Sequence, residues 1–144
     1  MHDGYPTKIL RTNALVVIPH EGRVLLEKGH DDIRNLDFYR PLGGGIEFME
    51  KSQDTAIREI KEEIGATLVQ LELLTVFENI FEFNAKPGHE ITFLYKGELA
   101  ETEFYQRQEI PILDKSDSSA EWISVSEIQE GKVLVFPGVV RDFL

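Results

Sequence analysis

The chain has 144 residues, of which 42% are hydrophobic and 28% charged, as is ordinary for one soluble globular domain, and this excludes disorder along its whole length. It contains no cysteine, which excludes disulfide bonds, thiolate metal sites and cysteine nucleophiles. The formal net charge of −11 at pH 7 disfavours nonspecific binding to nucleic acid or to an anionic membrane. We therefore expect a single domain over residues 1–144 that binds neither.

The N-terminus gives no sign of export. Its first residues, MHDGYPTKIL, lack the basic start and apolar core of a secretory signal peptide. The longest purely apolar stretch, Ala14 to Ile18, is far shorter than the ~20 residues that cross a bilayer. Together with the missing cysteines, these features predict a cytoplasmic protein. The sequence leaves open whether it is a monomer or a homodimer.

The first third of the chain predicts a β-hairpin followed by a glycine-rich loop. Two β-rich runs, Thr12–Pro19 and Arg23–Lys28, flank a His-Glu-Gly turn. We expect a loop over Gly29–Asp37, because this stretch is polar. We also expect a tight, irregular backbone over Phe38–Phe48, because a proline and three consecutive glycines occur there.

The next segment predicts a helix over about residues 53–64. Ser52 suits the N-cap position and Gly65 supplies a stop. Four apolar residues recur at helical spacing and would pack on a sheet: Ala56, Ile57, Ile60 and Ile64.

The rest of the chain predicts mainly strands. Two β-rich segments, Thr67–Asn84 and Glu90–Leu99, bracket a turn-forming stretch at 85–89 and should pair. A polar loop at 102–119 would contain a short strand near 110–113. The remaining segments predict a strand at Glu121–Val125, a short helix at Ser126–Glu130 and a terminal helix at Pro137–Leu144. This order indicates an α+β fold in which a mixed β-sheet lies between helices.

Three glutamates crowd one side of the predicted helix. Glu59 and Glu63 are four residues apart, and Glu62 is three residues from Glu59. Like charges at this spacing destabilise an isolated helix, but they also make a ligand set for Mg²⁺, which prefers carboxylate oxygens and accepts substrate phosphates. Charged helix faces are more often simply solvated, so these residues alone favour the simpler interpretation.

The wider spacing reverses that preference. Gly44 is followed after five residues by Glu50 and after seven more by Arg58, which leads into Glu59-Ile60-Lys61-Glu62-Glu63-Ile64-Gly65. Because each glycine and charged type is uncommon on its own, coincidence at all these positions is remote. The pattern resembles the signature of the Nudix hydrolase family at every charged and glycine position. It departs from the signature at Met49, where glycine is frequent, and at Ala66, where a bulky aliphatic residue is usual.

The resemblance implies a Nudix-like α/β/α sandwich and a role for each matching residue. Glu59, Glu62 and Glu63 would hold Mg²⁺, or Mn²⁺, and one of them would help to activate the attacking water. The backbone carbonyl of Gly44 would be a further ligand. Arg58 would pair with a glutamate, most simply Glu50, and fix the loop against the helix.

Substrate contacts are expected from the segment before the helix. The glycines let the backbone approach metal and phosphates without side-chain clash: Gly43, Gly44 and Gly45. Tyr39 and Phe48 are candidates for stacking on a base. A general base outside the motif is common in the family. Glu90, at a strand start, is preferred over the acidic residues at 101–118, although surface charge is the simpler interpretation for each of them.

The resemblance implies metal-dependent hydrolysis of a phosphoanhydride bond in a nucleoside diphosphate linked to another group. A nucleoside triphosphate, a nucleotide sugar and ADP-ribose are all substrates of that kind. Two alternatives stay open: a non-catalytic nucleotide-binding sensor and an RNA 5′-end pyrophosphohydrolase. The intact glutamates argue against the sensor, and the lack of a basic patch in the sequence argues against RNA.

Overall fold

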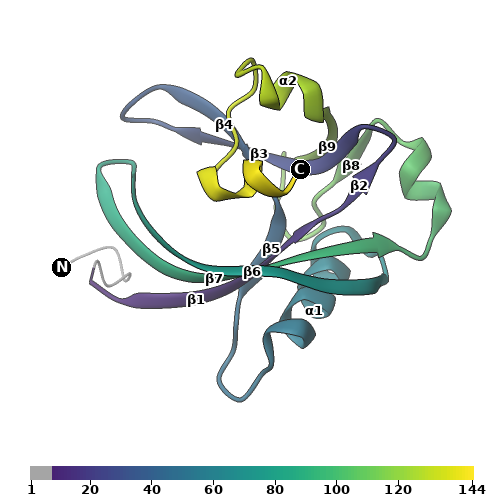
Figure 1. Cartoon of the computed structure of the whole chain (residues 1–144), viewed down its shortest axis with the longest axis horizontal. Coiled ribbons are helices and arrows are strands. Elements are labelled where there is room, and N and C mark those ends of the chain that lie inside the picture. Colours follow the sequence, from purple (N-terminus) through teal and green to yellow (C-terminus); the bar gives the residue numbers. More distant parts are fainter. Residues whose placement is uncertain (1–7) are drawn as a thin grey trace.

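A computed structural model describes residues 8–144, and within them it contains two β-sheets, two α-helices and two 3₁₀ helices (Figure 1). Most of the N-terminal segment that bears on a signal peptide lies outside the described residues. No helix within the described part of the chain is long and apolar enough to cross a membrane.

The first sheet is mixed and has the strand order β5-β1-β7-β6. Its strands are β1 (Leu10–Val17), β5 (Leu42–Gly45), β6 (Leu68–Phe83) and β7 (Lys86–Leu99). β1 runs parallel to β7, and the other pairs are antiparallel. β6 and β7 form a long, curved hairpin that reaches past the other strands (Figure 1).

The second sheet is antiparallel and has the order β2-β3-β9-β8, with β4 also paired to β3. Its strands are β2 (Pro19–His20), β3 (Arg23–Asp31), β4 (Leu36–Arg40), β8 (Glu109–Pro111) and β9 (Ser119–Ser124). The 3₁₀ helix η1 (Thr102–Gln106) precedes β8.

Helices cover both faces of the strand layer. The helix α1 (Ser52–Ile64) packs on one face, and α2 (Val125–Gln129) and the 3₁₀ helix η2 (Gly138–Phe143) lie on the other (Figure 1). Side chains alternate along each strand, so Ala14 of β1 joins the core under α1 while Leu15 joins the core with Ile128 of α2. This arrangement confirms the predicted α/β/α class, with the strand layer divided between two sheets.

The helix α1 agrees with the predicted helix at 53–64 except at its start. Lys51 occupies the N-cap, and the Ser52 hydroxyl instead lies 2.6 Å from the Tyr95 hydroxyl, so the predicted Ser52 cap is wrong. Gly65 ends the helix in the left-handed conformation, as predicted, with φ of 76°. Three of the four stripe residues are buried, but Ile57 is 36% exposed and lies at the edge of the stripe.

Several predicted loops are partly strand. β3 continues to Asp31 and β4 begins at Leu36, inside the loop expected over Gly29–Asp37. The stretch expected to be irregular holds β4 and β5, because pairing with β3 and β1 overrides its composition. The turn expected at 85–89 shrinks to Asn84 and Ala85, both with positive φ, and β7 begins directly after them.

The last elements are close to their predicted places. β8, β9 and α2 lie within two residues of the segments expected near 110–113, at Glu121–Val125 and at Ser126–Glu130. The terminal helix expected over Pro137–Leu144 is a 3₁₀ helix, η2.

Candidate active site

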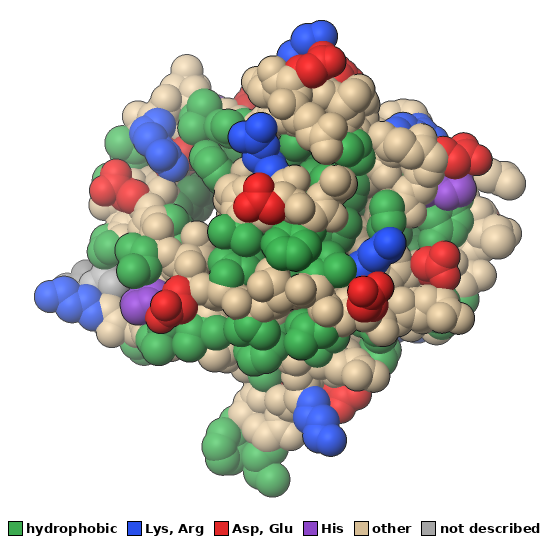
Figure 2. Space-filling view, in the orientation of Figure 1, with side chains coloured by type: hydrophobic (Ala, Val, Ile, Leu, Met, Phe, Trp, Pro, Cys, Tyr) green, Lys and Arg blue, Asp and Glu red, His purple; other side chains and the backbone are tan. Residues whose placement is uncertain are grey.

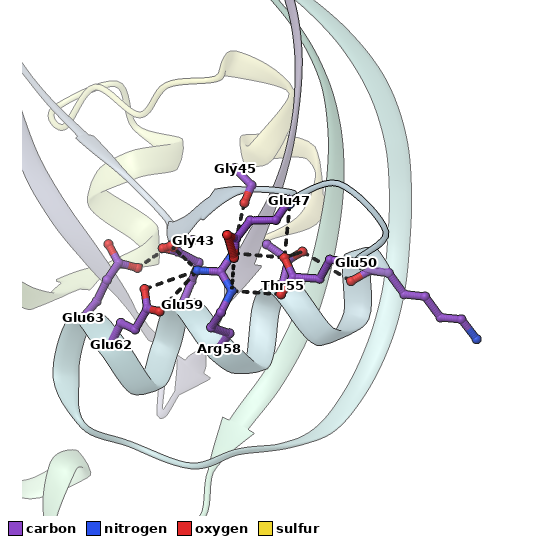
Figure 3. A network of polar contacts seen from close by, with 10 residues as sticks. Gly43, Gly45, Glu47, Glu50, Thr55, Arg58, Glu59, Glu62 and Glu63 are labelled. Atoms are coloured by element: carbon purple, nitrogen blue, oxygen red, sulfur yellow. Dashed lines mark hydrogen bonds and ion pairs between the residues drawn. The ribbon is translucent and has the colours of Figure 1, made fainter.

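The residues of the motif meet where β5 lies beside α1 (Figure 3). The polar side chains come from the helix and from the connection that precedes it. The glycine-rich strand β5 contributes backbone groups. The network that joins them follows from the register of β5 on its neighbour β1.

That register decides which glycine peptide groups face α1. The N–H of Ile46 donates to the carbonyl of Thr12, its opposite residue, at 3.0 Å. Opposite residues of an antiparallel pair alternate between those that exchange such bonds and those that do not. Gly44, two residues earlier, therefore turns its N–H and carbonyl toward β1, while Gly43 and Gly45 turn theirs outward. The register does not support the Gly44 carbonyl as a metal ligand, because that carbonyl faces β1.

Glu63 is the most deeply buried of the three glutamates, with 5% of the residue exposed. Its Oε1 accepts a hydrogen bond of 2.9 Å from the N–H of Gly43. Burial raises the pKa of Glu63 to about 8; the bond from Gly43 works against this shift, and the nearby carboxylates of Glu27, Glu59 and Asp114 add to it. A bound cation would reduce the electrostatic repulsion between Glu63 and these neighbouring carboxylates.

Glu59 lies directly against the backbone of Gly44. A Cβ atom built on Gly44 would lie 2.4 Å from the carboxylate of Glu59, so any side chain there would displace that carboxylate. Burial raises the pKa of Glu59 above its ordinary value, and the nearby Arg58 partly offsets that shift. The side chain of Glu59 is 14% exposed.

Arg58 ties the connection before α1 to the helix (Figure 3). Its Nε and Nη2 donate to the two carboxylate oxygens of Glu50 at 2.8 and 3.0 Å, and Nη2 also reaches the carbonyl of Gly45 at 3.1 Å. Its Nη1 lies 3.2 Å from Glu62, which is 49% exposed. Hydrogen bonds from Arg58 and then from Thr55 lower the pKa of Glu50 to about 2. Glu50 is therefore a fixed anion that holds Arg58 in place.

The donor set fits a hard divalent cation. Carboxylate and backbone carbonyl oxygens are the ligands that Mg²⁺ and Mn²⁺ take in proteins. The carboxylate of Glu63 is buried and that of Glu59 half-buried, both beside other acids, and a bound cation would offset the cost of this arrangement. As the side chains stand, no three His, Asp or Glu residues within 8–144 are grouped closely enough to hold an ion, and Glu62 turns to Arg58 instead.

The structure does not bring Glu90 to these glutamates. It lies on β7, where its Oε1 accepts a bond of 3.4 Å from the side chain of Asn13. Side chains alternate along β7, so Glu90 lies on the same face of the strand as Leu94. Leu94 belongs to the hydrophobic core on the α2 side of the strands. This alternation turns Glu90 away from α1, so its place near the start of a strand does not bring it to the site.

The two aromatic residues expected to stack on a base, Tyr39 and Phe48, lie in different surroundings. Tyr39 is on strand β4 rather than in a loop, and it packs half-buried against the core on the α2 side. Phe48 is 96% exposed at the tip of the connection between β5 and α1. This connection projects from the molecule, and Figure 2 shows hydrophobic side chains gathered on the projection.

Two further acidic residues lie near the glutamates, and the sequence analysis singled out neither of them. Glu27 of β3 is 3% exposed, and it contacts Lys115 and Ser118 at 3.1 and 3.0 Å. A lone acid inside the apolar run RVLLEK was the signal that could have identified it. Asp114 lies in the loop after β8, inside the acidic stretch 101–118, and no local pattern distinguishes it there.

Comparisons with known proteins identify the family and the fold. The family model of the NUDIX domain matches residues 9–142. The fold is similar to the MutT protein from Methanosarcina mazei Go1, with a TM-score of 0.62 and 22% identity over 96% of this chain and 93% of that chain. It is also similar to a NUDIX hydrolase from Nitrosomonas europaea, with a TM-score of 0.64 and 17% identity over 93% of this chain and 85% of that chain.

At such identities the solved structures establish the fold alone, and the family rests on the family model. That model covers nearly the whole chain and includes every residue of the network around Arg58. The chain therefore belongs to the NUDIX family and is a Nudix-type hydrolase.

Proposed function

We propose that this hydrolase cleaves a phosphoanhydride bond in a nucleoside diphosphate linked to another group, with Mg²⁺ or Mn²⁺ held by Glu59, Glu62 and Glu63. Nudix hydrolases in general hydrolyse pyrophosphate bonds in small nucleotides and use divalent metal ions. The observation that carries the proposal is the pair of carboxylates, buried Glu63 and half-buried Glu59, packed against the glycine backbone of β5.

The backbone of β5 supplies a further ligand atom for the metal. The carbonyl of Gly43 faces outward beside Glu63, so we assign to it the ligand role first given to Gly44. Arg58 holds Glu62 in the metal-free chain, and Glu62 would turn from Arg58 to the metal. When bound, the metal neutralises phosphate charge and lowers the pKa of the attacking water.

Glu63 is our candidate for the proton acceptor. Its Oε1 is engaged by the N–H of Gly43, so Oε2 is the atom assigned to take the proton. The oxygen of the attacking water then bonds to phosphorus, the anhydride P–O bond breaks, and a nucleoside monophosphate and a second phosphorylated product leave.

The acidic charge of the chain favours a small nucleotide over RNA. A net charge of −11 repels a polyanion, whereas one diphosphate needs only local neutralisation. We also propose that the protein works in the cytoplasm, where free nucleotides are abundant.

A substrate panel tests this function. Nucleoside triphosphates, nucleotide sugars and ADP-ribose would be incubated with Mg²⁺, with Mn²⁺ and with chelator, and the phosphorylated products identified. We expect metal-dependent release of a nucleoside monophosphate, and a loss of at least about 10²-fold in kcat for Glu63→Gln with an unchanged circular dichroism spectrum. Nucleotide binding without turnover would identify a sensor, and turnover of triphosphorylated RNA alone would identify an RNA-end hydrolase.

A further inference from the structure

Beside the proposed metal site lies a buried carboxylate with two cationic partners. Glu27 is 3% exposed, and its Oε2 accepts hydrogen bonds from the Lys115 ammonium group at 3.1 Å and from the Ser118 hydroxyl at 3.0 Å. Its Oε1 forms an ion pair of 3.6 Å with Nη2 of Arg40, the residue opposite it on β4. Burying a carboxylate is costly unless such partners compensate for the lost water.

The two cations differ from Glu27 in exposure. The side chain of Arg40 is 49% exposed and that of Lys115 is 46% exposed. Each therefore has one side on the buried carboxylate and another side open to a ligand. The contact of Arg40 is longer than a hydrogen bond, so its planar N–H donors can turn to an oxyanion without a strong bond being broken.

The loop that carries Lys115 is fixed to α1 at the proposed metal site. The N–H of Leu113 donates to the backbone carbonyl of Glu63 at 2.7 Å, and the N–H of Ile112 closes the loop by donating to Ser118 at 2.9 Å. Arg40 reaches the same buried carboxylate, Glu27, from β4, and Gly43, three residues after it in the chain, donates to Glu63. Both cations are thus tied to segments that also contact Glu63.

A diphosphate at this site needs more positive charge than the helix supplies. The three glutamates repel it, and Arg58 is already engaged by Glu50 and by the carbonyl of Gly45. We propose that Arg40 and Lys115, held in position by Glu27, form an anion-binding site that holds a phosphate group of the substrate beside the metal-binding glutamates. The inference rests on the proposed function and specifies how the substrate is bound. Glu27 is a positioning residue, because it acts through the two cations.

A non-hydrolysable diphosphate tests the site without turnover. Methylenediphosphonate would be titrated calorimetrically into the protein at saturating Mg²⁺. We expect Lys115→Gln and Arg40→Gln each to raise Kd about tenfold, as the loss of one charge-assisted hydrogen bond predicts. Lys115→Arg keeps the charge and should restore most of the affinity. Lys132→Gln is the matched control, since Lys132 is 67% exposed and pairs with Glu130 at 3.1 Å, and it should bind like wild type.

A second measurement tests whether Lys115 binds the anion or instead stabilises the metal site. Mn²⁺ would be titrated into wild type and Lys115→Gln without any anion, and the two affinities should agree within about twofold. Equal diphosphate affinity in wild type and both glutamine variants, or a loss of Mn²⁺ affinity in Lys115→Gln as large as its loss of diphosphate affinity, would overturn the inference. Because the probe is never cleaved, these results do not depend on whether the substrate panel finds turnover.

Glu27→Gln completes the test. The amide keeps the shape of the side chain but removes the charge that holds Arg40 and Lys115, so Kd for methylenediphosphonate should rise in this variant too. In Glu27→Gln combined with Lys115→Gln, the loss of affinity should be smaller than the sum of the two single losses, because part of the effect of Glu27 acts through Lys115. Full additivity would contradict the positioning role of Glu27.

Discussion

The N–H of Gly43 donates a hydrogen bond of 2.9 Å to the carboxylate of Glu63, and this bond joins the glycine-rich strand β5 to the last turn of α1. It favours the charged form of Glu63. Burial works against it and prevails, so that the pKa of Glu63 is raised to about 8. The site therefore holds a carboxyl group whose ionisation is unfavourable until a cation arrives.

We predict that the metal-free protein loses stability as the pH rises from about 5 to about 8. The pKa of Glu63 is higher in the folded chain than the ordinary value of 4.5, so the folded state binds the proton more tightly. This advantage is present at low pH and disappears as the pH rises through the folded pKa. A shift of this size corresponds to on the order of 5 kcal/mol. Thermal melts in chelator across this range measure it.

Glu63→Gln is the control for that pH dependence. The amide cannot ionise, so Tm should fall much less steeply with rising pH in this variant. A smaller fall should remain, because the pKa of Glu59 is also raised. Saturating Mn²⁺ should flatten the wild-type profile as well, because the cation stabilises the charged carboxylate. An equally steep fall in Glu63→Gln would show that other groups control the stability.

Gly44→Ala should abolish most activity without unfolding the chain. The new methyl group would lie 2.4 Å from the carboxylate of Glu59 and would displace it. We expect kcat to fall by at least about tenfold, as is usual when the surroundings of a ligand are disturbed. Gly45→Ala is the matched control, since its nearest neighbour is the carbonyl oxygen of Thr12 at 4.0 Å, and it should keep near-wild-type kcat. Equal losses in the two variants would contradict the steric explanation.

Arg58→Lys should weaken the site although it keeps the charge. Lysine cannot reproduce the paired bonds of 2.8 and 3.0 Å to Glu50 together with the bond to the carbonyl of Gly45. We expect Mn²⁺ affinity and kcat to fall roughly 10-fold or more, with a lower Tm. Lys61→Arg, an exchange on the exposed side of the same helix, should change none of these. Titration with Mn²⁺ and steady-state kinetics measure both variants.

The helix and its acidic edge could be predicted because their signals are local. Apolar residues recur at helical spacing in α1, and Gly65 ends it with a positive φ, as the sequence indicates. The strand pairing of Gly43 to Gly45 was missed, because it depends on β1, about thirty residues earlier in the chain. That pairing decides which peptide groups face α1, and it is the reason why we propose the carbonyl of Gly43, rather than that of Gly44, as a metal ligand.

Residues outside the motif could not be placed from the sequence for the same reason. Glu90 and Glu27 are both acids on strands, and only the alternation of side chains within a known sheet shows that the first faces away from α1 and the second toward it. Lys115 meets Glu27 across 88 residues of sequence. No short pattern records a contact of that kind.

Met49→Gly should stabilise the protein. Met49 is 90% exposed and has φ of 69°, in the left-handed region that disfavours residues with a Cβ atom. Its position is one where the family signature often has glycine. Relief of this strain should raise the free energy of unfolding by about 1 kcal/mol, measured by chemical denaturation. Phe48→Gly is the control: Phe48 is as exposed but has no positive φ, so glycine should lower stability there, and a gain in both variants would argue against strain at Met49.

Asp31 should control the acid stability of the fold. Its buried carboxylate accepts bonds from the backbone N–H groups of Arg34 at 2.9 Å and Asn84 at 3.1 Å, and so joins the turn after β3 to the turn after β6. These bonds, that of Arg34 first, lower the pKa of Asp31 to about 2. A group with a lowered folded pKa contributes stability above its ordinary value of 3.8 and loses it as the pH falls toward 2.

Asp31→Asn tests this contribution. At neutral pH the variant should melt several degrees lower than wild type, because an amide meets the same N–H donors without a charge. The difference should shrink as the pH falls below about 3, where the wild-type carboxylate itself becomes protonated. Asp142→Asn, at an exposed position in η2, should follow wild type throughout. A difference in Tm between Asp31→Asn and wild type that stays constant down to pH ~2 would mean that the geometry of the side chain, rather than its charge, joins the two turns.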